Sequence, residues 1–361
     1  IRKSRFVQLY NKIGTLYNEG KSSKAIEVLH EQSKSIVDFS LVKTNYDTVF
    51  HDFNMRQIER MKEYDEFKNN RIAFGIHELD YYTNGGIERG SSVLLMARSG
   101  RGKSTGMKWF ALSAANAGYK VVHFQLEGTR DEAMTLYDSG WTATPMYEIE
   151  RGFLPENRVE PTSKALGNIR KKGGEVFVIE ATSFDSLTIE SCRTSIIELE
   201  KQHGKIDLAV FDYLDIMKTN AFQGHDESKE RAKRLYVANK ITDIARNLNI
   251  GCVTATQANN IEDSLLNNPN FVMTRSNIAD AKNIIYPFSY FITINQTDDE
   301  YENGIARLYC DKLRKEKSGQ VVYICQALKI ARFYDAKRTL NVFWDHNTCK
   351  KIVGPSQEKV A

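Results

Sequence analysis

Residues 91–105 constrain the fold of this chain more than any other stretch. They read SSVLLMARSGRGKST, an apolar run that leads into a glycine-containing loop and ends in Gly-Lys-Ser-Thr. This order predicts a buried strand, a tight loop and the first turn of a helix. The spacing is that of a phosphate-binding loop, in which backbone N–H groups and a helix N-terminus face the phosphates, a lysine reaches the β/γ oxygens and a hydroxyl binds Mg²⁺. The residues assigned to this role are Ser99, Gly100, Arg101, Gly102, Lys103, Ser104 and Thr105.

One position departs from the usual phosphate-loop pattern. Ala97 stands where the first glycine is expected, so the motif reads A-x-x-x-x-G-K-S. The alternative is a chance Gly-Lys-Ser sequence on a surface turn. A chance match would not supply the strand-like residues 93–96 directly in front of the loop. We therefore interpret the stretch as a P-loop that binds ATP, or another nucleoside triphosphate, together with Mg²⁺.

From Ile72 onward, short apolar runs alternate with helical patterns, as expected of an α/β protein with a doubly wound, mostly parallel sheet. In such sheets ligands bind at the carboxyl ends of the strands. The predicted strands are 92–97, 120–126, 175–180, 207–212, 250–256, 289–295, 305–311 and 340–345. The predicted helices are 103–117, 129–140, 164–171, 188–203 and 229–248.

Polar residues stand at the ends of four of these strands: Glu127, Asp212, Gln257, and the pair Lys312 and Arg314. An aspartate after an apolar strand is what the Mg²⁺-supporting partner of a P-loop requires. The amide of Gln257 could sense the γ-phosphate, and the two cations point the same way if their strand continues. Each position also has a simpler explanation, namely a capping Glu, a turn Asp, an exposed Gln or a basic edge strand.

Residues 1–70 have a different, helical pattern. Apolar residues between Phe6 and Tyr17 recur at helical spacing up to Gly20, and a second helix can begin after Ser22. A further apolar stripe needs a surface to bury against, either in its own domain or in a neighbouring subunit. We therefore divide the chain into a helical N-terminal region and linker helix, 1–70, and a large α/β domain, 71–361. The stripe consists of Met55, Ile58, Met61, Tyr64 and Phe67.

Composition narrows the class of protein. With 41% hydrophobic and 11% aromatic residues, the chain can bury a sizeable core. It has no run of 18 apolar residues and no signal-peptide pattern, so we expect a soluble, cytoplasmic protein without a membrane partner. Its five cysteines lack C-x-x-C spacing, which argues against a zinc site or a disulfide framework and for a reducing compartment.

The net charge of +4 is unevenly distributed. Residues 307–351 contain eleven Lys and Arg but four Asp and Glu. A basic segment in a chain with a nucleotide site suits a polyanionic partner such as nucleic acid. A solvated basic surface is an equal alternative.

Taken together, these motifs resemble the hexameric replicative DNA helicases of bacteria and phages, the DnaB-like group with a RecA-type motor. The resemblance covers about residues 72–315. It rests on FGIHELDYYTNGGIERGSSVLLMARSGRGKST, FQLEG, DLAVFDYLDIM, TATQANN and KLRKEKSG. The helical front end resembles the family's linker region. The chain begins with Ile, and a complete family N-terminal domain is missing, so we expect that a preceding part lies outside this sequence.

The resemblance implies a role for each matched residue. Lys103 and Ser104 would hold the phosphates and Mg²⁺, with Asp212 supporting the metal through water. Glu127 would activate the attacking water, and Asp212 is the alternative base. The remaining matches are Gln257, which would couple nucleotide state to the DNA loops, and Lys312 and Arg314, which would act on the neighbouring subunit's γ-phosphate as piston and arginine finger.

The family's DNA-binding loops fall here at about residues 216–228 and 258–283. Cations and amides suffice to follow a nucleic-acid backbone. The candidate DNA-binding residues are Lys218, Arg275, Asn277 and Lys282. The sequence departs from the family at residues 320–338, which intervene before LNVFWD, where family members pass more directly from the glycine to that edge strand.

Two functions from different classes remain open at this point. The first is an ATP-dependent ring helicase that moves along single-stranded DNA as a homohexamer, with primase and a helicase loader as partners. The second is a RecA-like recombinase or regulatory ATPase that assembles on nucleic acid without unwinding it. The motif spellings favour the helicase.

Overall fold

The computed structural model describes residues 2–22, 24–25, 28, 57, 70–180, 187–222, 227–258, 261–278, 282–336, 342–345 and 350–353. The chain divides into two compact units, Ile1–Tyr64 and Asp65–Ala361. In the first unit, helix α1 (Arg2–Asn18) confirms the first predicted helix. It ends at Asn18, and the φ of 74° at Gly20 lets Lys21 N donate back to Leu16 O at 3.0 Å. The apolar stripe of the predicted linker helix lies outside the described residues.

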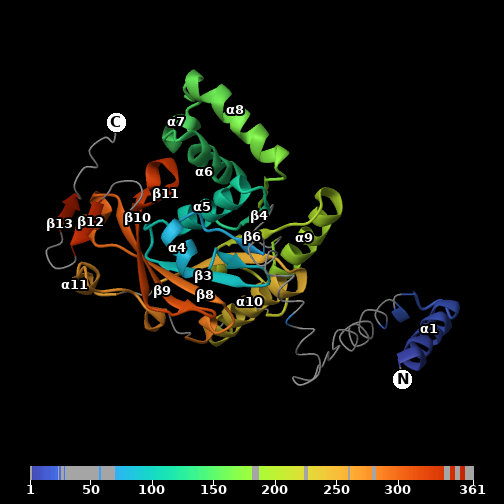
Figure 1. The fold of residues 1–361 in the computed structure, drawn as a ribbon. Coiled ribbons are helices and arrows are strands. Elements are labelled where there is room, and N and C mark those ends of the chain that lie inside the picture. The colour runs from blue at the N-terminus through green and yellow to red at the C-terminus, as the bar shows by residue number, and fades with distance from the viewer. Residues whose placement is uncertain are drawn as a thin grey trace. The chain divides into compact units, whose positions relative to one another are not determined.

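The second unit alternates strands and helices along the chain (Figure 1). Its strands are β1 (Arg71–Ile72), β2 (Ile87–Glu88), β3 (Ser92–Ala97), β4 (Lys120–Gln125), β5 (Glu175–Glu180), β6 (Leu208–Asp212), β7 (Gly251–Gln257), β8 (Tyr290–Asn295), β9 (Ile305–Leu313), β10 (Gln320–Ala327), β11 (Arg332–Asp335), β12 (Val342–Asp345) and β13 (Lys350–Val353). Its α-helices are α4 (His77–Tyr82), α5 (Lys103–Asn116), α6 (Arg130–Thr142), α7 (Met146–Glu150), α8 (Glu156–Lys171), α9 (Ile189–His203), α10 (Glu227–Leu248), α11 (Asp263–Leu266) and α12 (Asp298–Glu302). Short 3₁₀ turns are η1 (Leu214–Ile216), η2 (Arg275–Asn277), η3 (Lys282–Ile285) and η4 (Leu328–Ile330).

The main sheet has the strand order β11-β10-β9-β8-β3-β7-β6-β4-β5. The strands from β8 to β5 in this order pair in parallel, whereas β8 to β11 pair antiparallel. This confirms the predicted α/β, RecA-like, doubly wound and mostly parallel fold. It also brings the carboxyl ends of β3, β4, β6 and β7 to one edge of the sheet, where ligands bind in such folds.

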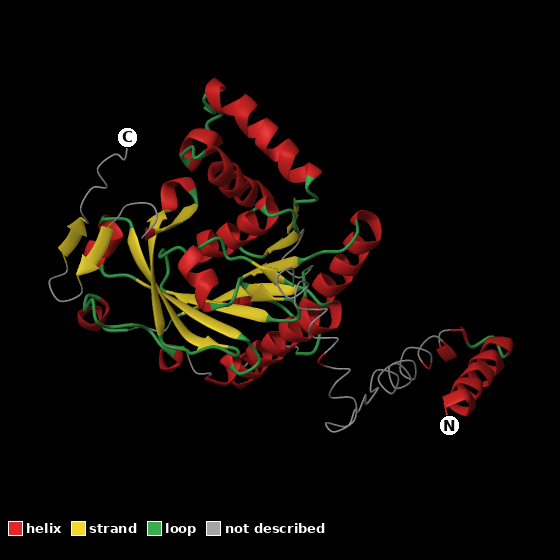
Figure 2. Cartoon of the chain, in the orientation of Figure 1, coloured by secondary structure: helices red, strands yellow, loops and turns green. Residues whose placement is uncertain are grey.

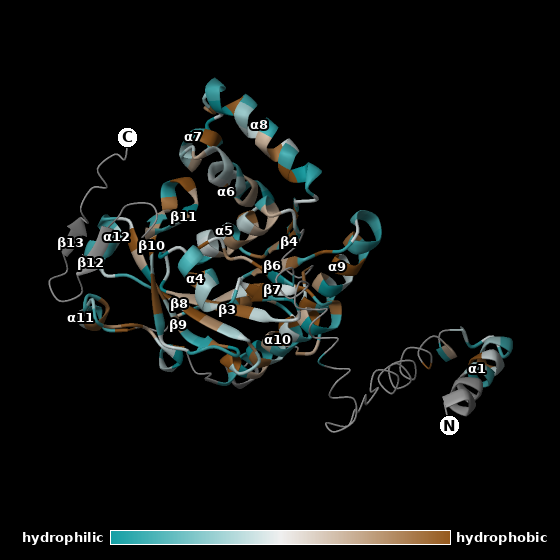
Figure 3. Cartoon of the chain, viewed as in Figure 1, coloured by the Kyte–Doolittle hydropathy of each residue, from teal (hydrophilic) through white to brown (hydrophobic). Residues whose placement is uncertain are grey.

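Helices cover both faces of the sheet (Figure 2), and the strands between them carry much of the hydrophobic colour in Figure 3. Along β3, Val93 and Leu95 pack on the side of α5, whose Phe110 is buried there. Leu94 and Met96 pack on the opposite side, against the layer that contains α9 and α10. A strand buried on both faces has a continuous apolar sequence, and for this reason the predicted bounds of β3 agree with the observed ones.

The carboxyl-terminal edge differs from the prediction. Residues 320–335 form the hairpin β10–β11, which extends the main sheet beyond β9. The predicted edge strand 340–345 is instead β12, which pairs with β13 in a separate two-stranded sheet. The expectation that LNVFWD closes the main sheet is therefore wrong, because β10 and β11 already occupy that edge.

The helix predicted at 164–171 is longer than expected. Helix α8 begins at Glu156 and accommodates Pro161 in its interior. Proline disrupts the helical hydrogen-bond ladder, so the sequence pattern predicts a start beyond it. Within the described ranges, no helix combines the length and the apolarity needed to cross a lipid bilayer.

Candidate active site

The loop between β3 and α5 exposes backbone N–H groups. Gly100 and Gly102 adopt φ values of 72° and 90°, which glycine reaches without steric cost. Helix α5 begins at Lys103, and within the described part of the chain no side chain caps it. Its first N–H groups therefore remain available to an anion. The structure places Ser99–Thr105 at the strand–loop–helix junction that the sequence predicted.

Ser104 and Asp212 meet beside this loop. Ser104 lies in the first turn of α5 and Asp212 is the last residue of β6. The Ser104 Oγ donates a hydrogen bond to Asp212 Oδ1 at 3.0 Å, and Asp212 is 2% exposed. Hydroxyl and carboxylate oxygens are the hard donors that Mg²⁺ prefers. The pair therefore fits a divalent cation at the amino end of α5.

The charges of three carboxylates act on the P-loop lysine. Burial lowers the pKa of the Lys103 ammonium, and the charges of Asp215, Glu127 and Asp212 oppose that shift. Glu127 is exposed and lies two residues beyond Gln125, which pairs in register with Asp212. The acids predicted at the ends of β4 and β6 therefore lie at the same edge, within electrostatic reach of Lys103.

Asp215 is a further candidate site residue, which the sequence motifs did not reveal. Its carboxylate accepts hydrogen bonds from Thr256 Oγ1 at 3.0 Å and from Gln257 N at 2.9 Å, and it lies 3.7 Å from Arg234 Nε. Burial raises the pKa of Asp215, while the Gln257 hydrogen bond and the Arg234 charge oppose the shift. Asp215 thus joins the segment after β6 to the end of β7 that carries Gln257, whose side chain is exposed.

A buried polar cluster lies behind Asp212. Lys108 Nζ is 3.4 Å and His123 Nε2 is 3.9 Å from Asp212 Oδ2, and His123 Nδ1 shares a 2.9 Å hydrogen bond with Tyr137 Oη. Burial lowers the pKa of Lys108, against the opposing charge of Asp212, and lowers the pKa of His123 well below its usual value. Sequence reasoning did not single these residues out, because nothing in a local pattern shows that a helix lysine will face a buried carboxylate.

The hairpin β10–β11 contacts the P-loop through Gln326 of β10. Gln326 Nε2 donates to Arg101 O at 3.1 Å, and a Cβ at Gly102 would overlap this amide. The Arg101 guanidinium pairs with Asp298 at 2.5 Å and lies 4.3 Å from the centre of the Tyr301 ring. The Arg101 side chain is therefore held by α12, although the sequence assigned this residue to the phosphates. Strand β10, in the segment 320–338, therefore contacts the backbone of the P-loop.

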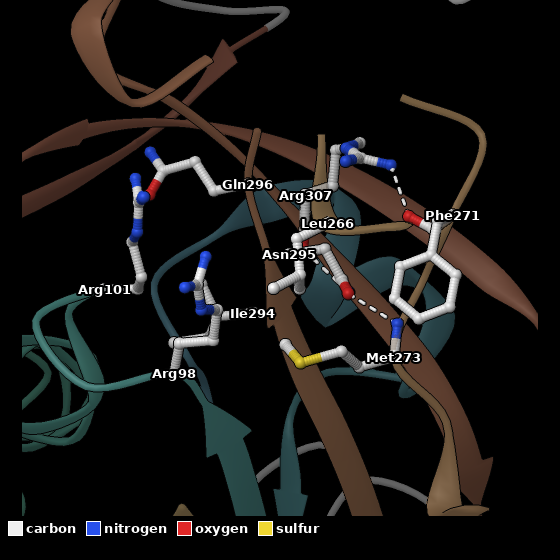
Figure 4. Close-up of a pocket in the computed structure, with 9 residues that line it drawn as sticks. All are labelled: Arg98, Arg101, Leu266, Phe271, Met273, Ile294, Asn295, Gln296 and Arg307. Atoms are coloured by element: carbon white, nitrogen blue, oxygen red, sulfur yellow. Dashed lines mark hydrogen bonds between the residues drawn. The ribbon is translucent and has the colours of Figure 1, made fainter. Parts of the chain in front are cut away.

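A small cavity of about 10 Å³ separates Arg98 and Arg101 from the ends of β8 and β9 (Figure 4). Arg307 lines it, is 1% exposed and pairs with Glu300 at 2.8 Å. A space of this size holds about one water molecule. It is a packing void beside the P-loop, and Arg307 is an internal cation that does not contribute to the basic surface considered for residues 307–351.

Lys312 and Arg314 do not lie on one strand face. Lys312 Nζ donates to the carbonyl oxygens of Tyr286 at 3.0 Å and Ile285 at 3.4 Å. Strand β9 ends at Leu313, and Arg314 follows as an exposed residue. The condition that the strand continues through Arg314 is not met, because the chain turns there.

The predicted DNA-binding residues have different surroundings. Lys218 is half-buried, and Asn277 Oδ1 accepts a hydrogen bond at 2.8 Å from the backbone N of Thr274, the N-cap residue of η2. Arg275 pairs with Asp311, with Nη2 3.1 Å from Oδ1 and the backbone N donating to Oδ2 at 2.7 Å. The side chain of Lys282 lies outside the described residues. Arg275 is thus fixed to β9, which anchors the segment 261–278 on the strand that carries Lys312.

Comparisons with known proteins agree with this geometry. A model of the DnaB-like helicase C-terminal domain matches residues 72–330. The replicative DNA helicase DnaB of Helicobacter pylori is 30% identical over 251 residues, which cover 68% of this chain and 47% of that protein. A probable replicative DNA helicase of Trieres chinensis is 22% identical over 262 residues, which cover 69% of this chain and 54% of that protein.

Two solved structures share the fold. One is an isolated ATPase domain, which superposes with a TM-score of 0.66 at 14% identity, over 80% of this chain and 99% of that chain. The other is a DnaB-like replicative helicase, from a study of its interactions with primase, which superposes with a TM-score of 0.63 at 16% identity, over 92% of this chain and 76% of that chain. At these identities the likeness establishes the fold alone.

The family model covers most of the α/β unit, from β1 to η4. The chain spans about half the length of the curated relatives it matches. The resemblance identified from the sequence is confirmed, and the chain belongs to the DnaB-like helicase C-terminal domain family.

Proposed function

We propose that this chain is the motor part of an ATP-dependent replicative DNA helicase that moves along single-stranded DNA as a homohexameric ring and unwinds duplex DNA. The observation that carries the proposal is the arrangement at the sheet edge, where Ser104 Oγ lies 3.0 Å from Asp212 Oδ1 and the charges of Asp215, Glu127 and Asp212 act on Lys103. This arrangement suits nucleoside triphosphate hydrolysis. Membership of the DnaB-like helicase family supports the coupling of hydrolysis to movement on DNA.

In this proposal the loop Ser99–Thr105 binds the ATP phosphates through its N–H groups, and Lys103 contacts the β/γ oxygens. The Arg101 side chain stays with α12, so this residue contributes its backbone only. Ser104 and, through water, Asp212 would hold Mg²⁺. Bound there, the metal would supply positive charge that offsets the negative charge developing on the phosphates.

Glu127 is the proposed general base. It is exposed at the rim of the site beside Lys103, whereas both oxygens of Asp212 already face Ser104 and Lys108. Gln257 would respond to the loss of the γ-phosphate. Its backbone link to Asp215 supports transmission of that response to the segment after β6.

The neighbouring subunit completes the proposed site. Arg314 is exposed beyond the end of β9 and would act as an arginine finger across the interface. Lys312 lies two residues before it and would act with it, although its ammonium contacts two carbonyl oxygens of its own chain.

The proposed DNA contacts are Lys218, Arg275, Asn277 and Lys282. Backbone contacts of this kind are independent of base sequence and weaken with salt. Primase and a helicase loader are the further proposed partners, and the cytoplasm is the proposed compartment.

A forked-duplex unwinding assay with ATP and Mg²⁺ tests the function, with the Lys103→Ala chain as the inactive control. Unwinding by the parent chain supports the helicase. Strand exchange or DNA-dependent hydrolysis without unwinding would favour the recombinase or regulatory ATPase instead. Electron microscopy with an ATP analogue and single-stranded DNA tests assembly, and particles without six-membered rings around the strand would contradict the hexamer.

A further inference from the structure

Two side chains of α5 contact the Asp212 carboxylate: Ser104, in the first turn beside the P-loop, and Lys108, which is buried. Ser104 and Lys108 stand four residues apart on α5 and so lie on one side of the helix. Ser104 reaches Oδ1 of Asp212 at 3.0 Å, and Lys108 reaches Oδ2 at 3.4 Å. Lys108 is 4% exposed. One face of the P-loop helix therefore engages both oxygens of the same carboxylate.

Lys108 is the closer of the two basic side chains that face this carboxylate, at 3.4 Å from Asp212 Oδ2. His123 Nε2 lies at 3.9 Å, and burial and the Lys108 charge lower its pKa, which disfavours its charged form. Burial also lowers the pKa of Lys108, whereas Asp212, Glu132 and Glu127 favour its charged form. A carboxylate this deeply buried is costly without a cation. Until a metal binds, Lys108 supplies that cation.

We propose that Lys108 sets the strength of Mg²⁺ binding at the P-loop site, by balancing the charge of Asp212 before the metal binds and competing with the metal once it has bound. Two cations that share one buried carboxylate repel each other over a few ångströms. The site therefore binds Mg²⁺ less tightly than it would without Lys108, and it releases Mg²⁺ with the diphosphate product more readily. This inference rests on the proposed nucleotide function.

The competing explanation gives Lys108 a structural role only, holding Asp212 in place for the metal. The two explanations predict opposite signs. Removing a competing charge strengthens Mg²⁺ binding, whereas removing a support weakens it. Lys108→Met keeps the length of the side chain and removes its charge, and Lys108→Arg keeps the charge. Lys201→Met, at an exposed position near the end of α9, is the matched control for loss of one positive charge.

The first measurement is equilibrium binding of a fluorescent ADP over a range of Mg²⁺ concentrations, with the whole chain. Lys108→Met should lower the Mg²⁺ concentration at half-saturation by about tenfold, the order expected when one like charge near a partly screened cation is removed. Dissociation of the Mg²⁺–ADP complex should slow by a similar factor. Lys108→Arg and Lys201→Met should behave as the parent does.

The second measurement is the thermal midpoint of unfolding with ADP, in EDTA and in Mg²⁺. Lys108→Met should be less stable than the parent in EDTA, because Asp212 then lacks its cation, and should gain more from Mg²⁺ than the parent gains. This comparison still decides the question if the variant is less stable throughout. If Lys108→Met does not fold, Lys108→Leu replaces it, with the same expectation of lower stability in EDTA and a larger gain from Mg²⁺ than the parent shows.

An unchanged or raised Mg²⁺ requirement in Lys108→Met would overturn the inference and leave a structural role. A parent chain that binds no nucleotide at any Mg²⁺ concentration would instead overturn the proposed function. The two failures are therefore distinguishable.

Discussion

Lys103 carries the principal side-chain cation at the predicted phosphate site. The charges of Asp215, Glu127 and Asp212 act on its ammonium, so removing the ammonium leaves these negative charges unopposed by Lys103 where the phosphates must bind. Lys103→Ala should therefore abolish nucleotide turnover while the fold survives, since the side chain is only partly buried. Phosphate release and circular dichroism check this, with exposed Lys171→Ala as the control. Hydrolysis at the parental rate would remove the P-loop assignment.

Glu127 and Asp212 differ in exposure and in the contacts of their carboxylate oxygens. Asp212 has both oxygens engaged, whereas Glu127 stands exposed at the rim. Glu127→Gln should keep nucleotide binding and slow hydrolysis by about 10² to 10⁴-fold, the usual contribution of a general base. Single-turnover hydrolysis and nucleotide affinity separate the two effects. If Glu127→Gln turns over normally while Asp212→Asn binds nucleotide without hydrolysing it, the two roles are exchanged.

At the scale of elements, Asp215 ties the segment after β6 to the end of β7. Asp215→Ala removes its hydrogen bonds to Thr256 and Gln257. The expected result is a lower ratio of DNA-stimulated to basal hydrolysis, by about fivefold or more, which is the lower end of typical coupling between sites. Asp243→Ala, which removes an exposed carboxylate of α10, is the control. A parental ratio in Asp215→Ala would show that this contact does not transmit the nucleotide state.

Some elements of the fold could be predicted from the sequence and others could not. Strands β3 and β6 are buried on both faces, and their predicted bounds agree with the structure to within one residue. The predicted strands do not include hairpin β10–β11, although alternate residues of β10, such as Val322 and Ile324, are buried and the family model's match to residues 72–330 includes β10. The candidate residues on the P-loop and at the ends of β4 and β6 follow from the topology, because parallel strands bring their carboxyl ends together. The roles of Lys108 and Asp215 do not follow from the topology, because tertiary packing decides which charged side chains come into contact.

At the scale of the whole molecule, the proposed assembly depends on Arg314. The transition state places negative charge on the γ-phosphoryl oxygens, and an arginine finger supplies about 10³ to 10⁵-fold in known cases. Arg314 follows β9, which is separated from β3 by β8 in the sheet. Its exposed side chain is therefore available to a partner. Arg314→Lys should remain strongly impaired in ATP hydrolysis, because lysine lacks a planar, bidentate guanidinium.

Mixing inactive subunits tests whether Arg314 acts across an interface. Arg314→Ala subunits keep an intact P-loop, and Lys103→Ala subunits keep an intact Arg314. In an equal mixture, roughly a quarter of head-to-tail interfaces would pair the two intact halves, and hydrolysis should return although each variant alone is inactive. If Arg314 acts within its own chain, every site in the mixture lacks one of the two groups. Persistent inactivity of mixed assemblies would then place the finger in its own subunit and remove the proposed dependence of hydrolysis on ring formation.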